Sequence, residues 1–598
     1  MSFFPVSDLI RNEGQLTAIR HRAGPMLVLA GPGSGKTYVI THHILYLISE
    51  CNILPQQILV ITYTKAAAEE MRRRAILLDK RCAYVQFGTF HAIFYQILKI
   101  SEPDKKLSVA SDKERLGFVS DFLKGMEHAN REKYAPKEQT RIKVDHAMEQ
   151  EAEEILKEIS LRKNNLSESG HTHNSKEPLF LKVWEAYESW LKEEGKLDFD
   201  DMVLHCYRLL KENALQREKW KKRFSHILMD EFQDINGLQY ETVKLLTKTD
   251  NIFAVGDDDQ SIYGFRGSDP LLMQQFIKEY APKTVKLSFN YRCCPDVVKL
   301  AARSIGHNKK RLPKTMEAVK KTKGSIVIKG FTNTTECATF LKEQIEEFAK
   351  HNPGKTQAVL CRTNRESAAY QGVYGSKMPF WIRDIKAYLS FINEGNKRED
   401  FLVIMNKPQR YISRTILEEG RIDFEKLAKR LADKPWIGKR LLELKEKFVF
   451  AKKLDLYGQL HYIWHVLGYG EYAKKREEKC ESMFYKLLKE AAGCRDWEML
   501  LEEQGMHHEE KEKSQAVFMT YHGAKGLEFD RVYLPGLNYG KVPHGRMLTA
   551  EAIEEERRMF YVAMTRAKEE LFLLYENEEE KNKDSKMESL SPFLAELL

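Results

Sequence analysis

A lysine and a threonine at the start of a predicted helix are the residues best suited to chemistry in this 598-residue chain. The backbone N–H groups of a glycine-rich loop and of a helix N-terminus bind phosphate anions. Lys36 would reach the β- and γ-phosphates of a nucleotide, and the Thr37 hydroxyl could ligate Mg²⁺. The first position of the motif is Ala30 rather than the usual glycine. The sequence still predicts a phosphate-binding P-loop, formed by Gly31, Pro32, Gly33, Ser34 and Gly35.

Two carboxylates and an amide would complete a site for nucleotide hydrolysis. Asp230 and Glu231 follow the apolar residues 227–229. Asp230 is placed to hold Mg²⁺, directly or through water, and Glu231 could take a proton from the attacking water. An acidic pair after an apolar run is common, so the pair gains its meaning from the P-loop in the same chain. Gln260 follows a further apolar run, and its amide could touch the γ-phosphate.

The elements that must position these groups are short apolar runs typical of buried parallel strands, at 26–30, 58–61, 227–229 and 252–255. Ligands of open α/β sheets bind beyond the carboxyl ends of the strands. We therefore expect the polar groups that follow these runs to share one edge of a sheet. Tyr63, Thr64 and His91 also follow predicted strands, at the place where a second ligand could lie.

The loop after Gln260 carries side chains suited to a nucleic-acid strand. Tyr263 and Phe265 could stack on bases, and Arg266 could hold a backbone phosphate. The alternative, that both rings belong to the core, is disfavoured by the glycines on either side. Far upstream, Gln15 could pair with the edge of adenine, although a surface turn explains it equally well.

Composition and cysteine usage bound the class of protein. The chain has 96 Lys and Arg against 87 Asp and Glu, a net charge of +9 that permits a polyanionic partner without requiring one. The nine cysteines show no C-x-x-C pair and no metal-ligand spacing, so we expect reduced thiols, a cytoplasmic protein and no structural metal. We expect neither a signal peptide nor a membrane span, because the chain has no basic start before an apolar segment and no apolar run of about 18 residues.

Taken in order, these motifs resemble those of superfamily 1 DNA helicases of the UvrD/Rep/PcrA type. The resemblance runs from residue 12 to about 570 and continues in the second half of the chain. The segments that carry it there are 287–292, 359–364, 520–529 and 554–567.

The resemblance implies an α/β fold with two RecA-like P-loop cores, parallel sheets flanked by helices, each core with a mainly helical insertion. The first core would combine 1–96 with 191–282 around an insertion at 97–190. The second would combine 283–392 with 513–576 around an insertion at 393–512, and 577–598 would be a charged tail.

The resemblance also assigns residues to two ligands. ATP would lie between the cores, with Tyr291, Arg292, Glu528 and Arg566 reaching it from the second core. Tyr291 would stack on adenine, and Arg292 and Arg566 would act on the γ-phosphate beside Lys36, Glu231 and Gln260. The implied DNA contacts are Tyr63, Thr64, His91, Tyr263, Phe265, Arg266, Asn364, His522 and His544.

The implied activity is that of an ATP- and Mg²⁺-dependent helicase moving 3′→5′ on single-stranded DNA and separating duplexes. Its substrates would be single-stranded and tailed duplex DNA, and a protein partner in repair, replication or defence stays open. Relatives usually carry Trp where Phe265 stands, and the second insertion is shorter than in larger relatives. One alternative is therefore a translocase that removes bound proteins with little unwinding. Another is an ATP-gated sensor or assembly subunit of a larger DNA-processing complex.

Overall fold

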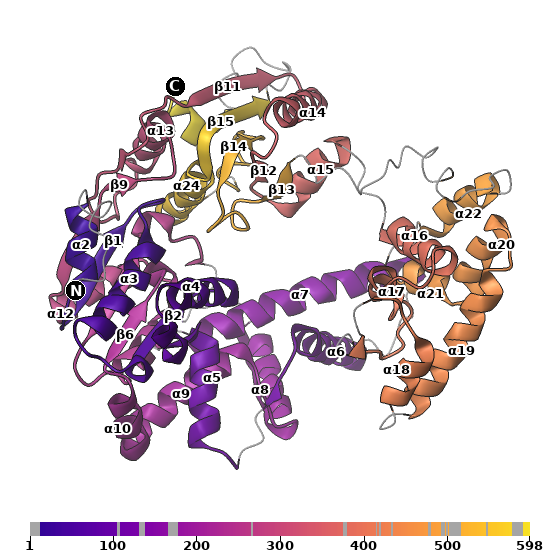
Figure 1. The fold of residues 1–598 in the computed structure, drawn as a ribbon, viewed down its shortest axis with the longest axis horizontal. Helices are drawn as coiled ribbons and strands as arrows, with labels where there is room; N and C mark the ends of the chain where they lie inside the picture. Colours follow the sequence, from indigo (N-terminus) through magenta and orange to yellow (C-terminus); the bar gives the residue numbers. More distant parts are fainter. Residues whose placement is uncertain are drawn as a thin grey trace. The chain divides into compact units, whose positions relative to one another are not determined.

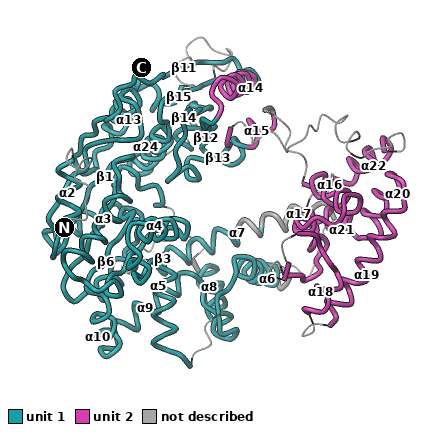
Figure 2. Tube along the Cα trace, in the orientation of Figure 1, with its two compact units in different colours: residues 1–337, 354–367, 518–598 teal, residues 338–353, 368–517 magenta. Residues whose placement is uncertain are grey.

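The computed structural model of the protein forms two compact units (Figures 1 and 2). Unit 1 comprises Met1–Cys337, Gly354–Ser367 and Phe518–Leu598, and unit 2 comprises Ala338–Pro353 and Ala368–Val517. The structure describes residues 12–598 except 105–107, 131–137, 165–176, 265–266, 375–379, 414–415, 418–419, 432–434, 477–479, 492–496, 498–499, 501–515, 546–547 and 577–589.

The first sheet of unit 1 has six strands in the order β3-β2-β6-β7-β1-β8, and every adjacent pair is parallel. Its strands are β1 (Met26–Ala30), β2 (Ile58–Thr62), β3 (Gln86–Thr89), β6 (His226–Met229), β7 (Ile252–Gly256) and β8 (Lys283–Leu287). The central strands are buried along their whole length. This is why they read as continuous apolar runs, and they coincide with the runs from which strands were predicted.

Helices cover both faces of this sheet, because successive side chains of each strand point to opposite sides. Leu27 and Leu29 pack with α5 (Phe90–Ser101), α9 (Phe199–Glu212), α11 (Gly237–Lys244) and α12 (Leu271–Tyr280). Met26, Val28 and Ala30 pack with α2 (Glu13–Ile19), α3 (Lys36–Ser49) and α4 (Lys65–Leu78). The helix α10 (Ala214–Arg223) leads into β6.

A helical insertion with its own core interrupts the first sheet between β3 and β6. Its helices are α6 (Asp112–Asn130), α7 (Glu138–Asn164) and α8 (Glu177–Glu193), and the short strands β4 (Ser108–Val109) and β5 (Lys196–Leu197) pair beside them. The buried ammonium of Lys163, at the end of α7, lies 2.9 Å from Asp198 and 2.7 Å from Asp201 at the start of α9. These ion pairs fix the end of the insertion to the helix that covers the sheet.

The second sheet of unit 1 has the strand order β11-β15-β14-β12-β13. The strands are β11 (Ser325–Phe331), β12 (Gln357–Cys361), β13 (Val517–Thr520), β14 (Phe529–Leu534) and β15 (Ala567–Glu576), and α13 (Pro295–Ile305) and α24 (Ala550–Met564) share its core. The two-stranded pair of β9 (Phe289–Asn290) and β10 (Glu317–Ala318) lies between the sheets in sequence. The two parallel sheets with helices confirm the predicted α/β class.

The end of the chain differs from the predicted charged tail at 577–598. Residues 590–598 include α25 (Pro592–Ala595), and Phe593, Leu594 and Leu597 are buried in the core of the second sheet. Their spacing places three apolar side chains on one side of the segment, and the charged run before them hid that signal. The run itself, 577–589, lies outside the described residues.

Unit 2 contains a core of helices, and its boundary also differs from the prediction. The helices of this core are α16 (Phe380–Asn393), α17 (Arg398–Ile404), α18 (Phe424–Arg430), α19 (Pro435–Ala451), α20 (Leu456–His461), α21 (Tyr469–Lys474) and α22 (Cys480–Ala491). The predicted insertion began at 393, but Trp381, Tyr388 and Phe391 of α16 are buried in this helical core. Most of α14 (Thr334–His351) and the second half of α15 (Asn364–Tyr374) are grouped with unit 2 as well. None of the described helices has the length and apolar character needed to cross a membrane.

Candidate nucleotide site and nucleic-acid interface

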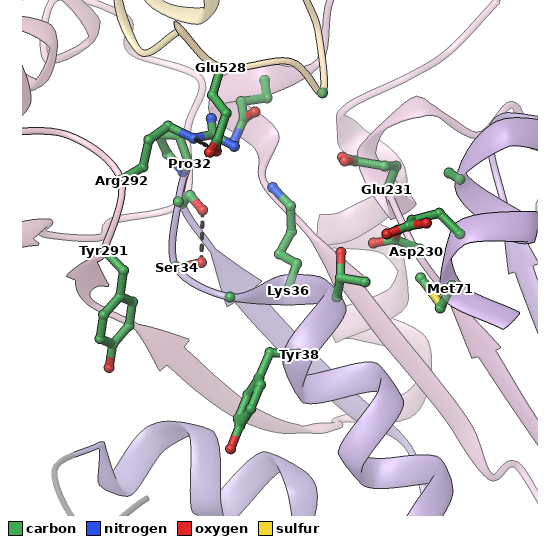
Figure 3. A pocket seen from close by; sticks show the side chains of 18 of the residues that line it. Pro32, Ser34, Lys36, Tyr38, Met71, Asp230, Glu231, Tyr291, Arg292 and Glu528 are labelled. Carbon is green, nitrogen blue, oxygen red and sulfur yellow. Dashed lines mark hydrogen bonds and ion pairs between the residues drawn. The ribbon is translucent and has the colours of Figure 1, made fainter. Parts of the chain in front are cut away.

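A cavity of about 560 Å³ in unit 1 brings together residues from both of its sheets (Figure 3). We call it the nucleotide cavity. The predicted residues that line it are Gly31, Pro32, Gly33, Ser34, Gly35, Lys36, Thr37, Asp230, Glu231, Gln260, Tyr291, Arg292, Glu528 and Arg566.

The P-loop has the backbone shape that its glycines permit. Gly33 and Gly35 have φ values of 65° and 86°, and Gly35 directly precedes α3. A Cβ atom on Gly33 would lie 2.6 Å from the Cβ of Arg292, so the loop runs tightly against the segment that leads into the second sheet. The ammonium of Lys36 donates to the carbonyl of Ala30 at 3.3 Å. Every residue type offers this backbone carbonyl, so the alanine at position 30 keeps the acceptor.

Gln15 stabilises the P-loop through a contact with its backbone. Its amide donates to the carbonyl of Ser34 at 2.9 Å, and a Cβ atom on Gly35 would come within 2.8 Å of that amide nitrogen. Asn12, which caps the same helix, donates to the Tyr291 hydroxyl at 3.1 Å. Gln15 therefore holds the loop beside the predicted adenine ring partner, whereas sequence reasoning had offered it only the edge of adenine or a surface turn.

The pKa values of the two acids after β6 are shifted in opposite directions. Burial and the neighbouring Glu231 carboxylate raise the pKa of Asp230 to about 7. Burial alone would raise the pKa of Glu231 too, but Lys36 and Lys525 outweigh it and hold this pKa below its ordinary value. Glu231 has a φ of 52°, a left-handed conformation that is uncommon outside glycine and recurs at functional sites. Its carboxylate accepts a 2.5 Å hydrogen bond from the side chain of Gln233.

Asp230 has the character expected of a metal ligand. Its Oδ1 atom is buried and makes no hydrogen bond within the described part of the chain. A buried acceptor without a donor is costly unless a cation or water meets it. Thr37, the other predicted ligand, lines the same cavity. The donor set of one carboxylate and one hydroxyl fits Mg²⁺, which prefers oxygen ligands and keeps several waters.

The part of unit 1 that carries the second sheet contributes two arginines, Arg292 before α13 and Arg566 before β15. Arg292 donates to the Glu528 carboxylate at 2.8 Å. Arg566 is almost fully buried and donates to the carbonyls of Val562 and Leu527 at 2.9 and 3.1 Å. Its remaining nitrogen lies 3.5 Å from the Gln260 amide oxygen, so the guanidinium meets a residue that follows β7 of the first sheet.

Burial is the main cause that lowers the pKa of Arg566 to about 9, and nearby Arg292 adds to it. The hydrogen-bond partners of Arg566 among the described residues are neutral oxygens, and a buried guanidinium with such partners favours the binding of a phosphate. Tyr291, by contrast, is 43% exposed.

An aromatic cluster, formed by Tyr63, Tyr263 and His522, gathers three of the predicted DNA contacts. The Tyr63 and Tyr263 rings are stacked, with centroids 4.8 Å apart and planes at 16°. The centroids of the His522 and Tyr263 rings are 6.1 Å apart. The Lys525 ammonium lies over the Tyr263 ring, 4.8 Å from its centroid. All three rings are half-buried. Residues from the segments that follow β2, β7 and β13 thus form one surface of rings beside a positive charge.

The other predicted DNA contacts lie at separate places. The ring of His91, on α5, packs edge-on against the exposed Phe199 at 5.9 Å, and Asn364 begins α15. The backbone N–H of His544 donates to Glu556 at 3.0 Å. The Thr64 hydroxyl caps α4 by accepting from the N–H of Ala67 at 3.1 Å. Phe265 and Arg266 lie outside the described residues.

Lys525 joins the two regions and was missed by sequence reasoning. Its ammonium donates to the Asp234 carboxylate and, at 2.7 Å, to the carbonyl of Gln260. It therefore touches the loop that supplies Gln260 to the nucleotide cavity while it covers a ring of the aromatic cluster. The residue lies inside the segment 520–529, but its partners are more than 260 positions away and leave no local signal.

Comparisons with known proteins agree with this arrangement. Residues 11–281 match the UvrD/REP helicase N-terminal domain, and residues 285–459 and 469–578 match the UvrD-like helicase C-terminal domain. The chain is 32% identical to YjcD of Bacillus subtilis over 96% of its own length and 79% of that protein. It is 30% identical to DNA helicase II of Haemophilus influenzae, over 99% of this chain and 88% of the relative. It is 28% identical to the ATP-dependent DNA helicase PcrA of Staphylococcus epidermidis, over 94% and 83%.

Proposed function

The chain belongs to the UvrD/Rep helicase family and is an ATP-dependent DNA helicase, and we propose that it moves 3′→5′ on single-stranded DNA. The polarity rests on the family resemblance, and the observation that most supports ATP-driven movement is the contact between Arg566 and Gln260 in the nucleotide cavity. It brings a cation of the second sheet to the hydrolysis site of the first. A nucleotide held there would pull the two sheets together, and its hydrolysis would release them.

We assign each side chain of the cavity a step in hydrolysis. Lys36 binds the β- and γ-phosphates, and the lowered pKa of Glu231 keeps that carboxylate ready to accept a proton from the attacking water. Arg292 and Arg566 stabilise the charge that develops on the transferred phosphoryl group, an effect of about 10³–10⁵ in rate in other NTPases. Mg²⁺ held by Thr37 and Asp230 would neutralise charge on the β- and γ-phosphates.

We propose that the aromatic cluster is the surface along which single-stranded DNA steps. Stacking on rings suits such a role because every base has a π-face, so the grip does not depend on sequence. Lys525 would respond to both ATP and DNA, because it contacts the carbonyl of Gln260 and the ring of Tyr263. His91, Asn364 and His544, together with Phe265 and Arg266, would extend the path of the strand.

Strand displacement on duplexes with a 3′ or a 5′ single-stranded tail tests the proposal. ATP-dependent unwinding of the 3′-tailed duplex, with little of the 5′-tailed one, is the expected result. Preference for the 5′ tail would contradict the polarity. DNA-stimulated ATP hydrolysis with no unwinding of either substrate would favour a translocase that clears bound proteins.

A further inference from the structure

Three consecutive aspartates after β7 form a buried negative cluster beside the nucleotide cavity. Asp257, Asp258 and Asp259 are each no more than 4% exposed. Adjacent buried carboxylates repel one another and lose hydration, so a fold keeps them only when cations meet them. Their oxygens lie close enough together to hold a metal ion. A lysine occupies that position instead.

The ammonium of Lys314 lies 2.8, 2.5 and 2.8 Å from Asp257, Asp258 and Asp259. The Lys314 side chain is only 3% exposed. Its three N–H groups match three acceptors, which is the full capacity of an ammonium. Arg311 adds a bidentate pair to Asp259, at 2.9 and 2.6 Å.

Both cations belong to a strap, residues 308–316, that follows α13 and leads to β10. The strap begins on the second sheet's side, where the Asn308 amide and the Lys309 N–H donate to Glu554 of α24 at 2.9 and 2.8 Å. It then reaches the aspartates, and Met316 near its end lies against Gly31 of the P-loop. The strap therefore connects α24 to the loop after β7, and none of its residues lines the nucleotide cavity.

Asp257 connects this strap to two of the groups proposed to act in hydrolysis, Gln260 and Glu231. Its carboxylate accepts from the Gln260 amide at 2.5 Å. Its backbone N–H donates to Gln233 at 2.8 Å, and Gln233 in turn donates to Glu231. A shift of Asp257 would thus move the Gln260 amide and the hydrogen bond that orients Glu231.

We propose that Lys314, supported by Arg311, is a positioning residue for hydrolysis, which fixes Asp257 and through it the γ-phosphate contact of Gln260 and the orientation of Glu231. The inference rests on the hydrolytic roles proposed above for these two residues. It adds a second link between the sheets, through residues other than the arginines that would contact the phosphate.

Charge neutralisation alone is the simpler reading, and two variants separate it from positioning. Lys314→Met removes the three ion pairs with the aspartates and leaves their negative charge without one of its compensating cations. Lys314→Met combined with Asp258→Asn removes one charge of each sign and restores the balance without restoring the grip on Asp257. Lys310→Met is the matched control, since Lys310 is on the same strap but pairs with Glu551 on the surface.

The experiment measures steady-state ATP hydrolysis with saturating oligodeoxythymidylate, together with the melting temperature of each variant. Lys314→Met should lower kcat about tenfold or more while KM for ATP changes little, because a misaligned base loses part of a contribution of about 10²–10⁴. The double variant should regain the melting temperature but keep the low kcat. Lys310→Met should match the wild type in both.

Two results would overturn the inference: a kcat of Lys314→Met close to wild type, or a double variant that regains kcat together with its melting temperature. The second would mean that Lys314 only balances charge. If Lys314→Met does not fold, the double variant carries the test alone. Failure of the proposed function is distinguishable, because it would show in the wild type as hydrolysis indifferent to DNA and no strand displacement.

Discussion

The nucleotide cavity and the aromatic cluster lie at the same edge of the first sheet, but they hold their side chains in different ways. In the cavity, Arg566 is almost fully buried and donates to several fixed acceptors. In the cluster, Tyr63 and Tyr263 are stacked on each other and remain half exposed. One region is locked by directed hydrogen bonds, and the other offers ring faces.

The difference follows from what each ligand demands. Phosphoryl transfer depends on groups held to within a fraction of an ångström, so the loss of one group removes most of the rate. A moving DNA strand needs contacts that form and break without regard to sequence, and stacking supplies these in small increments. Substitutions in the cavity should therefore abolish most of the ATP hydrolysis, whereas substitutions in the cluster should weaken DNA binding by small increments.

The largest effect is expected for Lys36→Ala. The phosphates lose the ammonium at the P-loop, so ATP hydrolysis should fall to the background of a protein-free control. Binding of single-stranded DNA in the absence of ATP should be unchanged. Lys65→Ala is the matched control, because Lys65 is an exposed lysine at the start of the next helix. Near-normal turnover by Lys36→Ala would contradict the role of the cavity.

Glu231→Gln should reduce kcat by about 10²–10⁴-fold, the usual contribution of a general base. Glutamine keeps the shape of the side chain and cannot accept the proton. Fluorescence titration with a labelled ATP analogue should show that nucleotide binding is retained. A variant that fails to bind ATP would make Glu231 a structural or metal residue.

A smaller and graded effect is expected for Tyr263→Ala. The change removes the ring that stacks on Tyr63 and covers Lys525, so affinity for oligodeoxythymidylate should fall by about 1–3 kcal/mol, while hydrolysis without DNA changes little. Tyr84→Ala, at a tyrosine that is 67% exposed in the segment before β3, is the control. If Tyr263 were a core ring, the variant would instead lose about 3–5 kcal/mol of stability, and a thermal melt would reveal it.

The smallest effect separates a cap from a DNA contact. Thr64→Ala should cost about 0.5–2 kcal/mol of unfolding free energy, because the hydroxyl that caps α4 is lost. Thr64→Ser keeps the cap and should restore stability. Weakened DNA binding by Thr64→Ala at an unchanged melting temperature would support the DNA contact that the sequence predicts.

The fold and much of the cavity were predictable because parallel buried strands leave continuous apolar runs, and several functional groups lie within a few residues of the end of such a run. Asp230 after β6 and Gln260 after β7 are examples. What the sequence did not reveal depends on distant partners. Lys525 meets Gln260, and Lys314 meets the aspartates after β7, across separations that no local pattern records.

Boundaries failed for a related reason. Nothing in the apolar stripe of α16 says which core it will join, and the helix is buried among the helices of unit 2. The apolar residues near the C-terminus follow a long charged run, so composition there suggested a solvated tail. The DNA contact predicted for Thr64 stays a prediction, because the cap that its hydroxyl gives to α4 neither supports nor excludes it.

The central claim is that the loop that begins at Gln260 couples ATP hydrolysis in the cavity to DNA binding at the aromatic cluster. The most direct test is ATP turnover with and without oligodeoxythymidylate, measured side by side for the wild type and Gln260→Ala. The wild type should be strongly stimulated by DNA, while Gln260→Ala should bind the DNA equally well and show slow turnover that DNA no longer stimulates. A wild-type rate indifferent to DNA at low salt, or full stimulation of Gln260→Ala, would contradict the account.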